Sequence, residues 1–153
     1  MAQSALFLDQ TESQRRQAID AETVFLAWRA ARKAAAEVRG SMLWRELRGK
    51  PTLIRTSASG AQKSLGPRSD ATQAMFDSFM ARKASTHERL QSLRAQLVTQ
   101  QRLNKALRVG RVPNVVVDVI NALDNIGVQD HFLVVGTHAL YAYESAAGVR
   151  ITE

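Results

Sequence analysis

The longest regular pattern of apolar positions lies in the middle of the chain and predicts a helix from Asp70 to about Arg108. This stretch contains no glycine or proline to interrupt it. Apolar residues recur mostly at spacings of three and four, which places them on one helix face: Met75, Phe76, Phe79, Met80, Leu90, Leu93, Leu97, Leu103 and Leu107. The leucines at 90, 93 and 97 form a short coiled-coil-like seam. It packs either on another helix of the chain or on a protein partner, such as a second subunit in a homodimer.

Residues 10–38 are predicted to form a second long helix. The middle of this stretch is rich in alanine, which favours helix and allows close packing. Phe25, Leu26 and Trp28 supply apolar contacts, and Gly40 ends or interrupts the helix. The sequence SMLWREL at 41–47 is then predicted to add another turn or two of helix, which Gly49 ends.

The stretch between these helices predicts a small β-hairpin near 51–65. Residues 52–55 favour a strand, SASG at 57–60 is typical of a turn, and AQKSL at 61–65 is the returning strand. Pro67 ends this pattern because its φ is fixed and it has no amide hydrogen. Ser69 then suits the N-cap of the following helix.

The C-terminal part shows a different pattern. VGRVP at 109–113 breaks the helical spacing and indicates a linker. A helix follows from Pro113 to Gly127, although its β-branched residues leave a strand start as the alternative. DHFLVVG at 130–136 predicts a buried strand, residues 137–148 a short helix ended by Gly148, and VRITE the start of a strand or loop. We therefore predict an α+β fold, with residues 1–110 as a helical arm carrying the hairpin and residues 111–153 as an incomplete helix–strand–helix α/β core.

Composition excludes several classes of protein. The 153 residues are 45% hydrophobic, which is ordinary for a globular domain, and include no cysteine. A disulfide framework, a thiol nucleophile and a thiolate metal site are therefore excluded. No apolar run reaches the roughly 18–20 residues of a membrane span, and the N-terminus does not resemble a signal peptide. We expect a cytoplasmic protein with no membrane partner.

The charge is concentrated in one stretch. Residues 28–68 hold ten Lys or Arg residues against two Glu, which accounts for the whole net charge of +7. Such a basic stretch attracts polyanions, and RNA or another nucleic acid is the first candidate. The alternative is a solvated, arginine-rich helix face. The candidate contacts to a nucleic acid or other acceptor are Arg45, Arg48, Lys50, Arg55, Lys63 and Arg68.

The junction between the predicted strand and the short helix is a candidate phosphate site. Gly136 lets a ligand approach the backbone, and the helix start presents free N–H groups. Thr137 adds a hydroxyl donor, and His138 could donate to a phosphate as well. The alternative is a threonine N-cap after a tight turn, because neither GxxxxGK[ST] nor GxGxxG is present.

This segment also carries two tyrosines and two histidines that could bind a ligand. Of Tyr141 and Tyr143, which face different directions on a helix, one is predicted to be core and the other to be free to stack on a base. His131 and His138 flank the predicted strand, but two histidines without a third ligand make a poor zinc site, so we predict no metal ligand.

The segment VVGTHALYAYESAAGV at 134–149 resembles the opening motif of a branch of the DNA-polymerase-β-type nucleotidyltransferase superfamily, which reads roughly GTxALYAYEAAAGV. KSLGPRS at 63–69 and RVP at 111–113 resemble upstream segments of the same branch. The resemblance implies transfer of a nucleoside monophosphate from NTP to an acceptor with the help of Mg²⁺. Gly136 and Thr137 would then contact the triphosphate. It also implies that a role in a toxin–antitoxin pair is credible by analogy.

The sequence departs from the superfamily at the carboxylates. No Asp-x-Asp or Glu-x-Asp follows Gly148, and the acidic residues after the corner are Glu144 and Glu153. The chain therefore looks like the N-terminal portion of such an enzyme. We expect it to bind Mg²⁺ poorly and to have no catalytic residues and no activity by itself. The alternative is a non-enzymatic module that binds nucleic acid or a protein.

Overall fold

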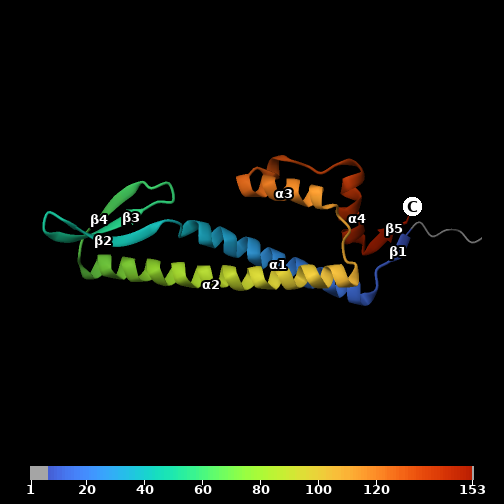
Figure 1. Cartoon of the computed structure of the whole chain (residues 1–153), viewed down its shortest axis with the longest axis horizontal. Helices are drawn as coiled ribbons and strands as arrows, with labels where there is room; N and C mark the ends of the chain where they lie inside the picture. Colours follow the sequence, from blue (N-terminus) through green and yellow to red (C-terminus); the bar gives the residue numbers. More distant parts are fainter. Residues whose placement is uncertain (1–6, 153) are drawn as a thin grey trace, which may run out of the picture. The chain divides into compact units, whose positions relative to one another are not determined.

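The computed structural model describes residues 7–152 and divides into two compact units. One unit comprises residues 1–22 and 99–153, and the other comprises residues 23–98. The element order confirms the α+β fold, since long helices alternate with small antiparallel sheets (Figure 1). Both long helices, α1 (Glu12–Glu37) and α2 (Asp70–Leu107), run from one unit into the other. Each unit is described by itself.

The unit formed by residues 23–98 contains a three-stranded antiparallel sheet. Its strands are β2 (Ser41–Leu47), β3 (Lys50–Thr56) and β4 (Gln62–Pro67), in that order across the sheet. The predicted hairpin is therefore confirmed, with Ser57 N–H donating to the Ala61 carbonyl at 2.8 Å across its turn.

The helix predicted over residues 41–47 is wrong, because this segment is strand β2. Arg48 (φ 52°) and Gly49 (φ 72°) both adopt the left-handed conformation, and Leu47 pairs with Lys50. Two positive φ angles in a two-residue loop are those of the turn that joins twisted antiparallel strands. Residues 41–47 can therefore fold back along β3, and pairing with that strand outweighs local helix propensity.

Helix α2 begins where the sequence predicts. Thr72 N–H donates to Ser69 Oγ at 3.3 Å, while Ser69 N–H donates to Thr72 Oγ1 at 2.9 Å. This reciprocal pair satisfies two amide groups that a helix start leaves without partners. Helix α1 has an equivalent cap, in which Gln14 N–H donates to Thr11 Oγ1 and Thr11 N–H to Gln14 Oε1.

The core of this unit lies between the sheet and the helices. Leu53 is completely buried, and Ile54, Phe79, Ala31 and Leu93 are nearly so. The burial of Leu93 places part of the predicted leucine seam inside the chain, which favours intramolecular packing of that face. The aromatic pair Trp44–Phe76 (ring centroids 6.0 Å apart) joins β2 to α2.

The other unit contains a two-stranded sheet and the C-terminal helices. Strand β1 (Phe7–Asp9) pairs antiparallel with β5 (Val149–Ile151). Within this unit the α1 side chain of Gln17 is buried and donates to Gln100 Oε1 (2.6 Å) and Asn104 Oδ1 (2.9 Å) of α2. The linker before Pro113 and helix α3 (Asn114–Ile126), ended by Gly127, are confirmed.

The buried strand predicted over residues 130–136 is wrong. The chain forms a short 3-10 helix, η1 (Gln129–His131), and then runs without regular structure to Val135. Phe132 is 61% exposed and Leu133 is 85% exposed. A strand requires a neighbouring strand for its backbone hydrogen bonds, and among residues 7–152 no strand pairs with this segment.

The helix predicted over residues 137–148 is confirmed in outline, with a different first turn. It begins as a 3-10 helix, η2 (Gly136–Ala139), and continues as α4 (Leu140–Ala147). Gly148 (φ 64°) ends it in the left-handed conformation, as expected for a helix C-terminus. The predicted α/β core is thus two helices joined by irregular chain, followed by β5.

Candidate functional site

The three residues predicted to contact phosphate lie together at the start of η2, and we call Gly136, Thr137 and His138 the Gly-Thr corner. All three are exposed. Gly136 has φ 73°, and a side chain there would meet no atom within 4 Å. The backbone conformation, rather than a shortage of space, is therefore what favours glycine at this position.

The alternative interpretation of Thr137 as an N-cap is wrong. The residue that caps η2 is Val135, and no side chain caps that helix start. Thr137 instead lies within the first turn, where the residue is exposed. The corner can therefore offer backbone N–H groups and a hydroxyl to an anion, as helix starts commonly do.

An ion pair between the exposed Arg111 and the buried Glu144 joins the linker to α4. Glu144 is 6% exposed, and its carboxylate accepts hydrogen bonds from Arg111 Nε (3.1 Å) and Nη2 (2.5 Å). The same carboxylate accepts from the Ile151 N–H at 2.8 Å, and Arg111 also donates to the Ile151 carbonyl at 3.0 Å. The hydrogen bond from Arg111 is the main reason that the pKa of Glu144 lies below its usual value.

The structure separates the two tyrosines. Tyr143 is 67% exposed. Tyr141 is half-buried, with its ring stacked on His138 (centroids 6.3 Å apart) and the Arg111 guanidinium 5.7 Å from its centroid. Tyr141 therefore lies in a contact series that begins at the Gly-Thr corner and ends at the Arg111–Glu144 pair.

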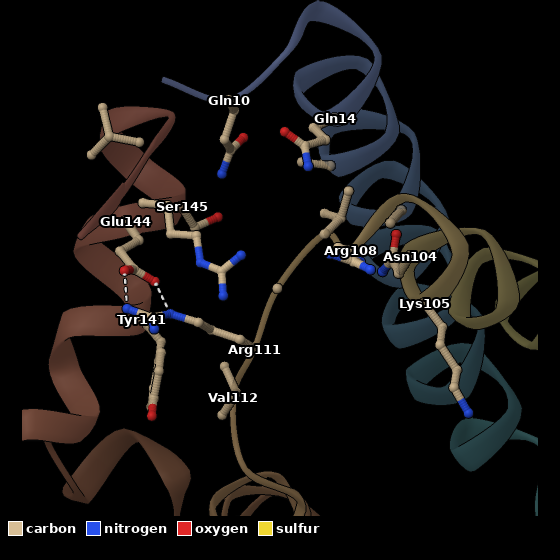
Figure 2. A pocket seen from close by; sticks show the side chains of 16 residues that line it. Gln10, Gln14, Asn104, Lys105, Arg108, Arg111, Val112, Tyr141, Glu144 and Ser145 are labelled. Atoms are coloured by element: carbon tan, nitrogen blue, oxygen red, sulfur yellow. Dashed lines mark hydrogen bonds and ion pairs between the residues drawn. The ribbon is translucent and has the colours of Figure 1, made fainter. Parts of the chain in front are cut away.

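Arg111 and Glu144 line a cavity of about 560 Å³, which we call the Arg111 cavity. The N-terminal part of α1, the end of α2, the linker and the α4–β5 segment all line it (Figure 2). Its charged lining residues are Lys105, Arg108, Arg111, Glu144 and Arg150. Sequence reasoning missed this cavity. The sequence features that point to it are Arg108 just before the linker, Arg111 within the linker, and Glu144 as the one charged residue of a short helix.

The six predicted basic contacts lie in the other unit and differ in availability. Arg45, Arg48, Lys50, Lys63 and Arg68 are exposed. Arg55 is half-buried, and its guanidinium donates to the carbonyls of Arg39, Ser41 and Thr56 and lies 4.4 Å from the Phe79 centroid. The structure thus gives Arg55 a packing role that the sequence did not reveal.

Residues that could hold Mg²⁺ do not gather in the part of the chain that the structure describes. Residues 7–152 contain no group of three or more His, Asp or Glu side chains able to share an ion. Glu144, the first acidic residue after the Gly-Thr corner, is already bonded to Arg111. These residues do not fit the ion that the resemblance implies. In the same residues, no helix is long and apolar enough to cross a membrane.

Comparison with known proteins connects the C-terminal segment to one family. Residues 114–153 match a family model described as Nucleotidyltransferase. The match covers about a quarter of the chain and includes α3, the Gly-Thr corner, α4 and β5. No curated protein and no solved structure matched the chain. The match agrees with the superfamily resemblance, while the particular motif branch stays a prediction.

Proposed function

We propose that residues 114–153 form the triphosphate-binding element of a nucleotidyltransferase and that the Gly-Thr corner contacts the phosphates of an NTP. The observation that carries the proposal is the coincidence of two facts. The family match spans this segment, and within it Gly136, with its left-handed backbone, opens an exposed helical turn. The proposal covers NTP binding. Transfer to an acceptor needs carboxylates that residues 7–152 do not bring together, so we propose that this chain alone transfers no nucleotide.

Isothermal titration of the chain with ATP, GTP, CTP and UTP tests the proposal. Each titration is run with and without Mg²⁺, first on the unchanged protein and then on a Gly136→Ala, Thr137→Val variant. Because the variant restricts the left-handed backbone and removes the hydroxyl, we expect it to bind NTP about tenfold more weakly or worse.

Gly60→Ala is the matched control. Gly60 also has a positive φ (87°) and open space around its Cα, but it lies in the β3–β4 turn. It therefore reproduces the backbone strain without touching the corner. If Gly60→Ala weakens NTP binding as much as the corner variant does, or if the corner variant binds NTP unchanged, the proposal is wrong.

A second candidate function is binding of nucleic acid by the sheet. Strand alternation and cross-strand pairing put Arg45 and Lys50 on one face of the sheet, and Arg48 lies in the turn between them. Arg45 donates to Gln62 Oε1 on β4 at 3.0 Å, so it lies across this face. Phosphate contacts from such residues depend steeply on salt, because binding releases counterions.

Titration of a short RNA at several salt concentrations tests this second function. An Arg45→Gln, Arg48→Gln, Lys50→Gln variant should lower both the affinity and its salt dependence. Arg82→Gln, Arg89→Gln, Arg94→Gln is the control, because it removes equal charge from exposed positions of α2. Equal losses in both variants would show only nonspecific attraction.

A further inference from the structure

We propose that the Arg111 cavity binds a phosphate-bearing small molecule of nucleotide size, at a place separate from the Gly-Thr corner. None of the three corner residues lines the cavity. The inference therefore does not depend on NTP binding at the corner, and it names a second site for the same class of ligand in the same unit.

The charge of the lining favours an anion. Four cationic side chains line the cavity, and the one carboxylate among them, Glu144, is bonded to Arg111 and to the backbone of β5. Among residues 7–152, no carboxylate lies within ion-pair distance of Lys105, Arg108 or Arg150. Lys105 and Arg108 thus face the cavity without a carboxylate partner in the described chain, whereas Arg150 is attracted through space to Glu144. The lining keeps an excess of positive charge, which a multiply charged anion would compensate.

Neutral polar groups add to this lining. The Gln10 backbone N–H donates to the Gly148 carbonyl at 3.0 Å, which fixes the start of α1 beside the end of α4. The Gln10 side-chain amide then points into the space opposite Arg111 (Figure 2). Amide donors beside guanidinium groups are a common arrangement around phosphate oxygens.

The size and one aromatic wall favour a nucleotide over a simple phosphate ion. A volume of about 560 Å³ falls within the range of small-molecule sites. Tyr141 lines the cavity as a half-buried ring already stacked on His138, and such a ring can add an apolar contact to a base. A free nucleotide and the 5′-phosphorylated end of a strand share this chemistry.

Titration calorimetry with AMP, ATP and pyrophosphate at low ionic strength tests the inference. The full chain is compared with an Arg108→Gln, Arg150→Gln variant and with an Arg94→Gln, Arg102→Gln control. The control removes equal charge from exposed α2 positions outside the cavity. Loss of two charge-assisted contacts should weaken binding about tenfold or more, and the control should change it less than about twofold.

Two additional variants keep the outcome interpretable. Arg108→Gln alone leaves β5 unchanged and should weaken binding about threefold or more. Thr137→Val should leave AMP affinity unchanged, because AMP lacks the β- and γ-phosphates of an NTP, whereas it weakens NTP binding at the corner, so the two sites can fail separately. Equal weakening in the cavity variant and the control, or no binding of any probe by the full chain, would overturn the inference.

Competition identifies the source of the phosphate. Bound ATP is challenged with a short oligonucleotide carrying either a 5′-phosphate or a 5′-hydroxyl. Displacement by the phosphorylated strand only supports the cavity as a strand-end site, and displacement by neither supports it as a free-nucleotide site. Equal displacement by both would overturn the inference, because backbone charge alone would then suffice.

Discussion

Arg111 and Glu144 form a two-point hydrogen-bonded ion pair that joins the linker after α2 to the last full turn of α4. The Glu144 carboxylate also accepts the Ile151 N–H, and Arg111 donates to the Ile151 carbonyl. These two side chains therefore connect three segments of the chain, namely the linker, α4 and β5. The pair is separated by 33 residues in sequence, so it is a tertiary contact that fixes the C-terminal segment.

We expect Glu144→Gln to destabilise the protein by about 2 kcal/mol. The substitution keeps the shape of the side chain but removes the charge that compensates Arg111, and an amide can accept through only one oxygen. Urea unfolding monitored by circular dichroism measures the effect. Glu88→Gln, an exposed position on α2, is the control and should change stability by less than about 0.5 kcal/mol. Equal stability of the two variants would show that the pair contributes nothing.

The Arg111–Glu144 pair should make the free energy of unfolding depend on pH. The pKa of Glu144 is lowered in the folded protein, first by the hydrogen bond from Arg111, so the unfolded chain takes up the proton more readily. The stabilisation is therefore complete above the ordinary carboxyl pKa of 4.5 and is lost as the pH falls through the lower folded value. Unfolding free energies measured from about pH 7 to about pH 3 should show the wild type losing its advantage over Glu144→Gln. A constant difference across that range would contradict this prediction.

Arg55 should matter for stability and Arg45 should not. The Arg55 guanidinium donates to three carbonyls and lies on the ring of Phe79, whereas Arg45 is exposed. We expect Arg55→Ala to cost about 2 kcal/mol and Arg45→Ala less than about 0.5 kcal/mol. Thermal and urea unfolding measure both. If the two variants are equally stable, Arg55 regains its place among the candidate nucleic-acid contacts.

Two glycines with positive φ should respond differently to alanine. A Cβ at Gly40 would lie 2.1 Å from the Thr56 carbonyl oxygen, whereas one at Gly136 would meet nothing within 4 Å. Gly136→Ala should cost only the conformational penalty of about 1–2 kcal/mol. Gly40→Ala should cost clearly more, because backbone at the end of β3 must move. Chemical denaturation of the two single variants gives the comparison, and a reversed order would contradict the packing described around Gly40.

Several elements were determined by local sequence. A serine directly before a long stretch of helical apolar spacing predicts an N-cap, and Ser69 together with Thr72 does cap α2. The stretch that follows, which no glycine or proline interrupts, forms the 38-residue helix. Gly127 and Gly148 end their helices in the left-handed conformation that glycine adopts without strain. These features depend on backbone conformation and on neighbours a few residues away, so the sequence itself contains the information.

Other features were decided only by tertiary structure. SMLWREL is compatible with helix, but pairing with β3 makes it strand β2. FLVV at 132–135 has the composition of a buried strand, yet no strand of the described chain pairs with it. The Arg111–Glu144 pair and its cavity require segments distant in sequence to meet, so periodicity and spacing could not place them. Local propensity specifies caps, turns and helix periodicity, whereas strand pairing and buried charge depend on which distant segment lies alongside.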